Sequence, residues 1–415
     1  MFRNTLADYP LAATAIALSL FGVAMVYSAG QTDIPTYVAP LWKSQLLWLC
    51  LGVLCAWGIG NSSVRLIEWA TWPAYLLTLL MLASLLVLGT GTGANGHMRS
   101  WFAIGGHRLG QPAEIAKIVV VLMLAKVLAE RREAPKSLLE LWKPALVVGL
   151  PFLLIMLQPD LGSAIVFVGI FFGMLFWSGV PWPLLVLLAS PVVSLVLSFS
   201  TGLWGAWFLV LIALVLWYKP YLLEGIVLVV TNVVAGVVAP ILWEHLAPHQ
   251  QNRLKVFLDP SADPRASGYH VLQSKIAIGS GGLFGSGFTL GTQKRSGFLP
   301  EQHTDFIFAV VGEELGFIGV TLALALFLAL LLRATRIASR ANDPFGSLVA
   351  FGLMSCWLVH VVVNVGMTLN LMPITGIPLP FFSYGGSFML ASWLGVGVLL
   401  RISGEGRGHA GALLS

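Results

Sequence analysis

The stretch EQHTDFIFAVVGEELGFIGVTLALALFLALLL, residues 301–332, places acidic groups at the beginning of a long apolar run. Asp305 lies directly before the run, and Glu313 and Glu314 lie two helical turns inside it. A run of this length is typical of a helix that spans a membrane, which needs about 20 mostly apolar residues. Charge in such a helix is costly unless it is solvated, paired or used, so these acids mark a candidate functional site.

The composition indicates an integral membrane protein. The chain has 415 residues, of which 57% are hydrophobic and only 10% are charged, whereas soluble domains carry about 25% charged residues. The net charge of +5 is therefore interpreted through its placement across the membrane, and no nucleic-acid partner is expected. The three cysteines lie in apolar stretches and have no disulfide or metal-binding spacing.

Twelve segments are apolar enough to span a membrane, which predicts an all-α polytopic protein with a single domain over residues 1–415. They are residues 10–28, 44–60, 69–89, 112–129, 144–158, 162–180, 184–200, 203–217, 223–244, 306–332, 345–369 and 384–401. Only Thr201 and Gly202 separate 184–200 from 203–217, which indicates a tight helical hairpin or one broken helix.

Lys and Arg residues in the short loops predict the orientation, because they are enriched on the cytoplasmic side. With the N-terminus inside, the inner loops hold most of these cations, and the C-terminus is also inside. Two long segments, 90–111 and 245–305, then lie outside. Asp305 is therefore expected at the outer membrane surface, at the end of the larger outer segment.

Asp305 belongs to the sequence HTDF, residues 303–306, and has two compatible interpretations. Thr304 or Asp305 could cap the following helix, since its first backbone N–H groups need acceptors. Asp305 could instead act as a general base or a cation ligand at the membrane edge. At least one of Glu313 and Glu314 should face a cavity or a basic partner.

A second group of charged residues follows the 90–111 segment. Pro112 is expected to open a helix, and Glu114 and Lys117 are spaced i, i+3, so they share one face of it. They could form a self-contained ion pair beside an interfacial Trp101. Alternatively, Arg99 and Lys117 could face the phosphate of an anionic head group.

Other polar segments also fall on the expected outer side. Asp160, in QPDLGS, could cap a helix or partner Lys117 or Arg99. Three prolines break the segment 373–387, and Ser383 follows them. Irregular backbone at this depth needs a protein or cavity environment, so the segment is expected to line the same cavity as Asp305.

Two further features suggest ligands only weakly. The glycine-rich run 279–291 could cradle phosphate with its N–H groups or form a flexible loop, but it follows no strand and so supports no dinucleotide motif. Asp259 and Asp263 could bind a metal, and the spacing of His245 and His249 is interrupted by a proline. The sequence contains no Walker-type loop, so an ATP-driven mechanism has no support.

Several of these motifs resemble the SEDS (shape, elongation, division and sporulation) family, on its RodA rather than its FtsW branch. The resemblance covers nearly the whole chain and rests on QPAEIAK, QPDLGS, SGYHVLQSKIAIGSGGLFG, LPEQHTDFIFAVVGEELG and PLPFFSYGGS. LDPSADP and Thr375 are RodA-like. Ala113 replaces the usual serine of the first motif. The family usually has ten spans, so the two extra ones, at 184–217, are expected to be an inserted pair.

The resemblance implies a peptidoglycan glycosyltransferase that polymerises lipid II on the outer face of the bacterial cytoplasmic membrane. It also implies a class B penicillin-binding protein as partner, within the machinery of cell-wall elongation. The family's essential aspartate falls on Asp305, its loop tryptophan on Trp101, and its charged pair on Glu114 and Lys117. Together with the residue patterns above, this gives the candidate substrate-binding residues Arg99, Trp101, Glu114, Lys117, Asp160, His303 and Ser383.

We expect Asp305 to accept the proton of a sugar 4-hydroxyl as it attacks the anomeric carbon. Lys117 and Arg99 would stabilise the departing pyrophosphate, with or without a Mg²⁺ or Mn²⁺ ion and without a nucleotide cofactor. A flippase of the lipid-linked precursor is the alternative, since twelve spans and proline-broken helices also suit transporters. A scaffold that only recruits a synthase is a third reading.

Overall fold

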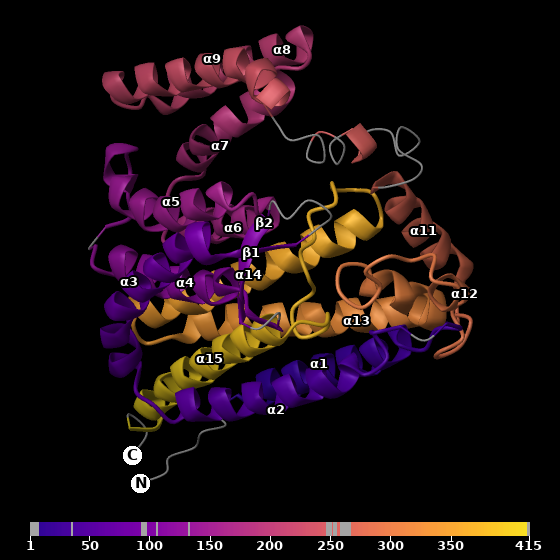
Figure 1. The fold of residues 1–415 in the computed structure, drawn as a ribbon. Helices are drawn as coiled ribbons and strands as arrows, with labels where there is room; N and C mark the ends of the chain where they lie inside the picture. Colours follow the sequence, from indigo (N-terminus) through magenta and orange to yellow (C-terminus); the bar gives the residue numbers. More distant parts are fainter. Residues whose placement is uncertain are drawn as a thin grey trace.

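The computed structural model describes residues 8–34, 36–92, 98–104, 107–131, 133–245, 251, 255–257 and 267–412. Long helices make up most of this part of the chain (Figure 1). They are α1 (Tyr9–Ala29), α2 (Leu41–Gly60), α3 (Val64–Leu88), α4 (Pro112–Ala129), α5 (Trp142–Leu157), α6 (Leu161–Trp177), α7 (Trp182–Leu197), α8 (Thr201–Tyr218), α9 (Leu222–His245), α13 (Ile307–Arg340), α14 (Pro344–Thr368) and α15 (Gly386–Ala412). Each predicted apolar segment coincides with one of them, which confirms the all-α class.

Nine helices within the described residues are long and apolar enough to cross a membrane. α4 carries three charged residues among its 18, and α6 and α7 have only 17 and 16 residues. The chain is a multi-pass membrane protein. That it spans the membrane twelve times stays a prediction. α1 begins and α15 ends at the same end of the molecule (Figure 1), as an arrangement with both termini on one side requires.

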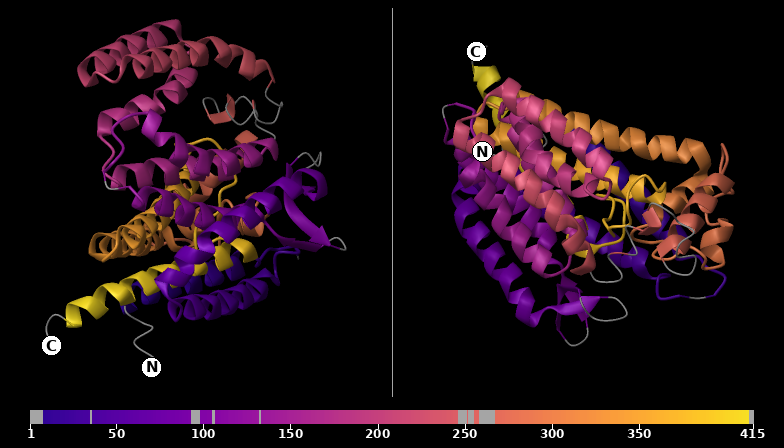
Figure 2. Two further views of the ribbon diagram at one scale, coloured as in Figure 1. Left: turned by 90° about the vertical axis from the view of Figure 1, so that its left-hand side faces the viewer. Right: turned by 90° about the horizontal axis from the view of Figure 1, so that it is seen from above.

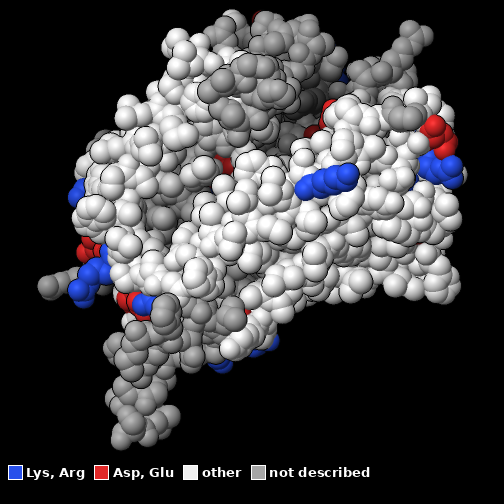
Figure 3. All heavy atoms as spheres, turned by 60° about the horizontal axis from the view of Figure 1, so that its bottom comes forward, with Lys and Arg blue, Asp and Glu red and all other residues white. Residues whose placement is uncertain are grey.

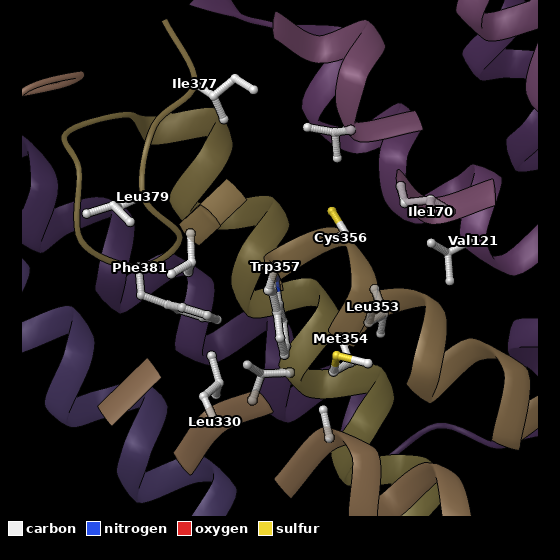
Figure 4. Close-up of a cluster of buried hydrophobic side chains, with 14 of the residues drawn as sticks. Val121, Ile170, Leu330, Leu353, Met354, Cys356, Trp357, Ile377, Leu379 and Phe381 are labelled. Carbon is white, nitrogen blue, oxygen red and sulfur yellow. The ribbon is translucent and has the colours of Figure 1, made fainter. Parts of the chain in front are cut away.

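Helix α14 lies at the centre of the molecule and packs against α4, α6, α13 and α15. In its most apolar stretch 78% of the residues are buried. Close packing requires small residues here: a methyl group on Gly352 would lie 2.7 Å from atoms of Val121 and Met174. On the other side, the rings of Trp357 and Phe381 meet edge to face with centroids 5.3 Å apart (Figure 4). α14 therefore provides the rigid surface on which the outer segments rest.

The described residues of segment 90–111 form a small antiparallel sheet, which was not predicted from the sequence. Its strands are β1 (Thr90–Thr92), β2 (Met98–Ile104) and β3 (His107–Gly110), in the order β1-β2-β3. The sheet leads directly into α4, whose first turn is joined to α15 because Gln111 N donates to Ser387 Oγ at 3.1 Å.

Helices α7, α8 and α9 project from the main body (Figures 1 and 2). They share a small apolar core of Leu187, Leu211 and Leu228. Asn232 on α9 donates to Ser190 Oγ at 2.7 Å and accepts from Ser194 Oγ at 2.5 Å, which joins α9 to α7. Only 6% of the residues in the apolar stretch of α8 are buried. The predicted inserted pair corresponds to α7 and α8 in position, and its origin as an insertion stays a prediction.

Within its described residues, the segment 245–305 includes α11 (Ser267–Ser280) and α12 (Thr292–Arg295). A short 3₁₀ turn, Leu139–Leu141, lies between α4 and α5. Between α11 and α12, the glycine-rich run enters a break in α13 at Gly316, where φ is +63°. Four backbone hydrogen bonds close the break: Ser286 N to Glu313 O (2.9 Å), Gly287 N to Glu314 O (3.0 Å), Phe317 N to Gly282 O (2.9 Å) and Ile318 N to Leu283 O (3.2 Å).

Glycine is needed for this contact. A methyl group on Gly285 would lie only 2.0 Å from Glu314 O, and Gly285 has a φ of +81°. The run therefore completes a broken helix, and two of the N–H groups that could have cradled phosphate are used for that purpose.

Candidate active site at the 303–305 turn

Three consecutive backbone carbonyls, at His303, Thr304 and Asp305, are each held by a side chain or N–H group from elsewhere in the chain. His303 O accepts from Tyr384 N at 2.9 Å, and Thr304 O accepts from Ser383 Oγ at 2.7 Å. Asp305 O accepts from Asn364 Nδ2, on α14, at 3.0 Å. Because the donors come from α14 and the 383–384 segment, the backbone of the HTDF motif is fixed against the centre of the protein.

The side chain of Asp305 lies beside the proline-broken segment. A methyl group on Gly376, which has a φ of +72°, would lie 3.3 Å from Asp305 Oδ2. Asn364 Nδ2 also donates to Ile377 O at 2.7 Å, so the same amide holds both segments. The 373–387 segment thus lies beside Asp305, and the expectation that the two line one cavity stays a prediction. Asp305 is partly exposed, so a substrate hydroxyl has access to a candidate base.

The helix-capping interpretation of Thr304 and Asp305 is wrong. The N-cap residue of α13 is Phe306, and its side chain makes no capping bond. Thr304 Oγ1 instead donates to Glu301 O at 3.3 Å. The backbone of Asp305 is held by the clamp from α14.

The predicted pair of Glu114 and Lys117 is present and fully enclosed. Lys117 Nζ lies 2.9 Å from both carboxylate oxygens of Glu114, and each residue is at most 4% exposed. Lys117 Nζ also lies 3.1 Å from His360 Nε2 on α14. Three acceptors thus surround the ammonium group, which has three protons to donate. The self-contained ion pair is the arrangement observed, and a head-group role for Lys117 stays a prediction.

His360 connects this pair to the segment beside Asp305. His360 Nδ1 lies 2.9 Å from Pro378 O. A carbonyl oxygen only accepts, so Nδ1 must carry the proton, and Nε2 of the neutral ring then accepts from Lys117. His360 and Asn364 lie one helical turn apart on α14, so one face of this helix contacts both the charged pair and the Asp305 backbone.

The remaining predicted residues divide into several cases. Asp160 caps α6 by accepting from Ser163 N at 3.0 Å, and it accepts from Gln111 Nε2 at 2.9 Å, so the capping interpretation is confirmed. Trp101 lies on β2 and is partly buried. Arg99 is on the same strand, but its side chain lies outside the described part of the structure. LDPSADP and His249 also lie outside the described residues, as does the turn at 105–106.

His303 lies between two aromatic rings, those of Tyr37 at 5.8 Å and Tyr384 at 5.8 Å between centroids. It is only 5% exposed. Burial lowers the pKa of His303 below its usual value, because the charged ring would lose its hydration, and nearby Glu301 opposes this effect. The neutral ring is therefore the form expected at pH 7.

The expectation that Glu313 or Glu314 has a basic partner is confirmed for Glu314. Lys294 Nζ, on α12, lies 2.6 Å from Glu314 Oε1, and both side chains are fully buried. Burial lowers the pKa of Lys294, although its hydrogen bond to Glu314 acts in the opposite direction. Glu313 accepts from Gln293 N at 2.7 Å. Both acids hold α12 in place and neither is part of the Asp305 contact.

The roles of His360, Lys294 and Asn364 were not predicted from the sequence. A histidine inside a 25-residue apolar helix was the available signal for His360. On the face shown in Figure 3, charged side chains are few and scattered over a largely uncharged surface. Among the described candidate residues, Glu114, Lys117 and Asp160 are buried, whereas Asp305 is partly exposed.

Comparisons with known proteins agree over nearly the whole chain. The family model FTSW_RODA_SPOVE, described as "Cell cycle protein", matches residues 9–208 and 204–408. The peptidoglycan glycosyltransferase RodA of Treponema pallidum is 34% identical, over 95% of this chain and 97% of its own length. The peptidoglycan glycosyltransferase MrdB of Escherichia coli is 35% identical, over 93% and 90%. Stage V sporulation protein E of Bacillus subtilis is 37% identical, over 97% and 98%.

Solved structures are also similar. A chain from a study titled "Structural coordination of polymerization and crosslinking by a peptidoglycan synthase complex" aligns with a TM-score of 0.71 and 29% identity, over 96% of this chain and 98% of its own length. The crystal structure of RodA from Thermus thermophilus aligns with a TM-score of 0.60 and 29% identity, over 95% of this chain and 96% of that one.

Proposed function

We infer the reaction and its residues from the premise that this chain belongs to the FtsW, RodA and SpoVE family and is a peptidoglycan glycosyltransferase. We propose that it polymerises lipid II on the outer face of the bacterial cytoplasmic membrane. The observation that carries the assignment of the site is the clamp on three consecutive carbonyls at residues 303–305, which presents the Asp305 carboxylate in a fixed position.

Asp305 is the proposed general base. It takes the proton of the acceptor 4-hydroxyl while that oxygen bonds to the anomeric carbon of the donor. The bond from this carbon to the pyrophosphate breaks in the same step, which predicts inversion. The leaving pyrophosphate is already a stable anion, so the reaction needs cationic groups rather than a second carboxylic acid.

Arg99 and Lys117 are the proposed cations for the pyrophosphate. Glu114 and His360 supply the present acceptors of Lys117, and a cavity of only about 10 Å³ adjoins this pair. A phosphate oxygen that reaches Lys117 must therefore replace one of these acceptors. The His360 bond, at 3.1 Å to a neutral ring, is weaker than the two bonds to the Glu114 carboxylate.

A divalent cation is proposed only as a companion of the substrate. The described residues contain no cluster of three or more His, Cys, Asp or Glu side chains that could hold a metal. Mg²⁺ commonly binds through one or two carboxylates together with substrate phosphates. Asp305 is a suitable single carboxylate, and we derive no step that depends on the ion.

We propose that a class B penicillin-binding protein crosslinks the product, and that the pair acts in cell elongation. The similarity to a chain from a peptidoglycan synthase complex supports the partner. The RodA-like sequence LDPSADP supports elongation over division.

Purified protein with its cognate transpeptidase partner, labelled lipid II and a divalent cation tests this function. Wild type should give glycan ladders on a gel, and Asp305→Asn should give none while remaining folded. Asp343→Asn is a matched control, because Asp343 caps α14 and asparagine is an equally good cap. Ladders from Asp305→Asn would refute the base. No ladders from wild type, with the partner bound, would favour a flippase.

A further inference from the structure

A cavity of about 530 Å³ lies between the 32–38 loop, which joins α1 to α2, and the 295–303 segment. Its volume is within the range of about 300–1,000 Å³ found for small-molecule sites. His303 forms part of its wall, two residues before Asp305. Two residues span at most about 7 Å, so the cavity approaches the reaction centre.

The two walls of the cavity are fixed to each other. Asp33 N donates to Arg295 O at 3.0 Å, and Arg295 Nε donates to Asp33 Oδ1 at 2.9 Å. Gln302 Nε2 donates to Ala29 O, at the end of α1, at 2.7 Å. A cavity held in this way does not have to be assembled when a ligand arrives, which favours binding.

Two buried polar atoms in the cavity wall have no partner in the described structure. They are Gln302 Oε1 and His303 Nδ1. The orientation of the Gln302 amide is determined, because its nitrogen donates to a carbonyl and its oxygen must therefore be the unpaired acceptor. Both atoms lie beneath the surface of the cavity, so a ligand would meet the wall through its exposed groups, which include the hydroxyls of Thr36 and Ser296.

The charge of the wall favours a neutral ligand. Asp33 and Glu301 are carboxylates, Arg295 is the one guanidinium among the lining residues, and the buried His303 is neutral. This balance disfavours pyrophosphate and the carboxylates of a stem peptide. The exposed ring of Tyr37, set edge-on to His303 with centroids 5.8 Å apart, offers an apolar surface beside the polar atoms.

We propose that this cavity is a saccharide subsite, which holds an uncharged sugar ring of the glycan while the adjoining sugar reacts at Asp305. The subsite rests on the proposed function, because it assigns a place to one part of that substrate. Thr36 and Ser296 contact the polar groups of the sugar, and Tyr37 covers one of its apolar faces. An enzyme that extends a glycan strand benefits from keeping the strand bound, since the product of one step is a substrate of the next.

Binding is tested in the Asp305→Asn background, where no turnover occurs. The probe is a soluble tetrasaccharide of N-acetylglucosamine, which is uncharged, because the muramic acid rings of the glycan carry free carboxylates once the peptide is removed. Ser296 is exposed and lines the cavity, whereas Phe298, two residues away, is exposed and does not line it. Ser296→Trp should weaken binding about tenfold or more, which is about 1.4 kcal/mol, and Phe298→Trp should leave it unchanged. Binding to the Asp305→Asn protein alone should depend little on salt, because the ligand is neutral.

With Asp305 intact, Ser296→Trp should raise KM for lipid II and retain kcat. Equal tetrasaccharide binding by Asp305→Asn alone, with Ser296→Trp and with Phe298→Trp would overturn the subsite. A Ser296→Trp protein that still binds the saccharide but no longer binds the partner's ectodomain would also overturn it. That result would indicate a protein docking surface. The proposed reaction is judged separately, because failure of wild type to make polymer does not affect the binding comparison.

Discussion

Replacing Lys294 with methionine should strongly destabilise the outer region of the protein. Lys294 and Glu314 are both fully buried, with Nζ and Oε1 2.6 Å apart. Without the cation, Glu314 keeps Ser28 Oγ at 2.5 Å and Gly291 N at 3.4 Å as donors. The uncompensated buried carboxylate should cost about 3–5 kcal/mol of unfolding free energy.

The double variant Lys294→Met with Glu314→Leu separates the two contributions to this cost. Replacing a buried pair by apolar groups of similar size is often nearly neutral, so the second substitution should restore most of the loss. The expected coupling energy is about 2 kcal/mol or more, well above the value for independent sites. Its size measures the penalty of leaving one charge alone, rather than the net value of the pair.

Reversible unfolding in mixed detergent micelles measures these free energies, and ladder formation is the second readout. The neighbouring residue supplies the control: Arg295 pairs with Asp33 on the surface, where both side chains are about half exposed. Arg295→Met should cost only about 0–1 kcal/mol. Additive effects of the Lys294 and Glu314 substitutions, or equal losses for Lys294→Met and Arg295→Met, would refute the reasoning.

Two further predictions concern the 303–305 turn. Asn364→Leu removes the amide that donates to the carbonyls of Asp305 and Ile377, so kcat should fall about tenfold or more with KM for lipid II nearly unchanged. Initial rates check this, and a wild-type kcat would contradict the clamp. Burial lowers the pKa of His303, so the unfolded chain takes up a proton below about pH 6.5 before the folded one does. Tm should therefore fall more between about pH 7 and 5 in wild type than in His303→Gln, and parallel Tm profiles would exclude His303 as the cause.

Much of the fold was predictable because hydropathy is a local property. Each apolar segment became a helix, with boundaries shifted by a few residues except at α13 and α15, which continue well beyond their apolar stretches to Arg340 and Ala412. The pair of Glu114 and Lys117 was predictable for the same reason, since i, i+3 spacing is a property of one helix. The need of Glu314 for a basic partner also followed from its position in an apolar run.

What could not be predicted depends on contacts between distant segments. Nothing local indicates that Lys294 reaches Glu314, or that His360 accepts from Lys117 across 243 positions of sequence. The Asp305 cap was predicted wrongly because capping residues are common before helices, whereas here the turn is held from α14. The glycine-rich run was ambiguous because phosphate cradles and close backbone contacts require the same residue type.

The break in α13 has a consequence for membrane insertion of the nascent chain. The loop groups that complete the break lie at residues 282–287, and the helix groups they bond lie at 313–318. During synthesis the loop leaves the ribosome first, so the loop groups that bond to α13 are already translated when α13 reaches the bilayer. An unpaired backbone group is costly in lipid. The order of the two segments along the chain therefore allows the N-terminal part of α13 to form before α14 and α15 have been made.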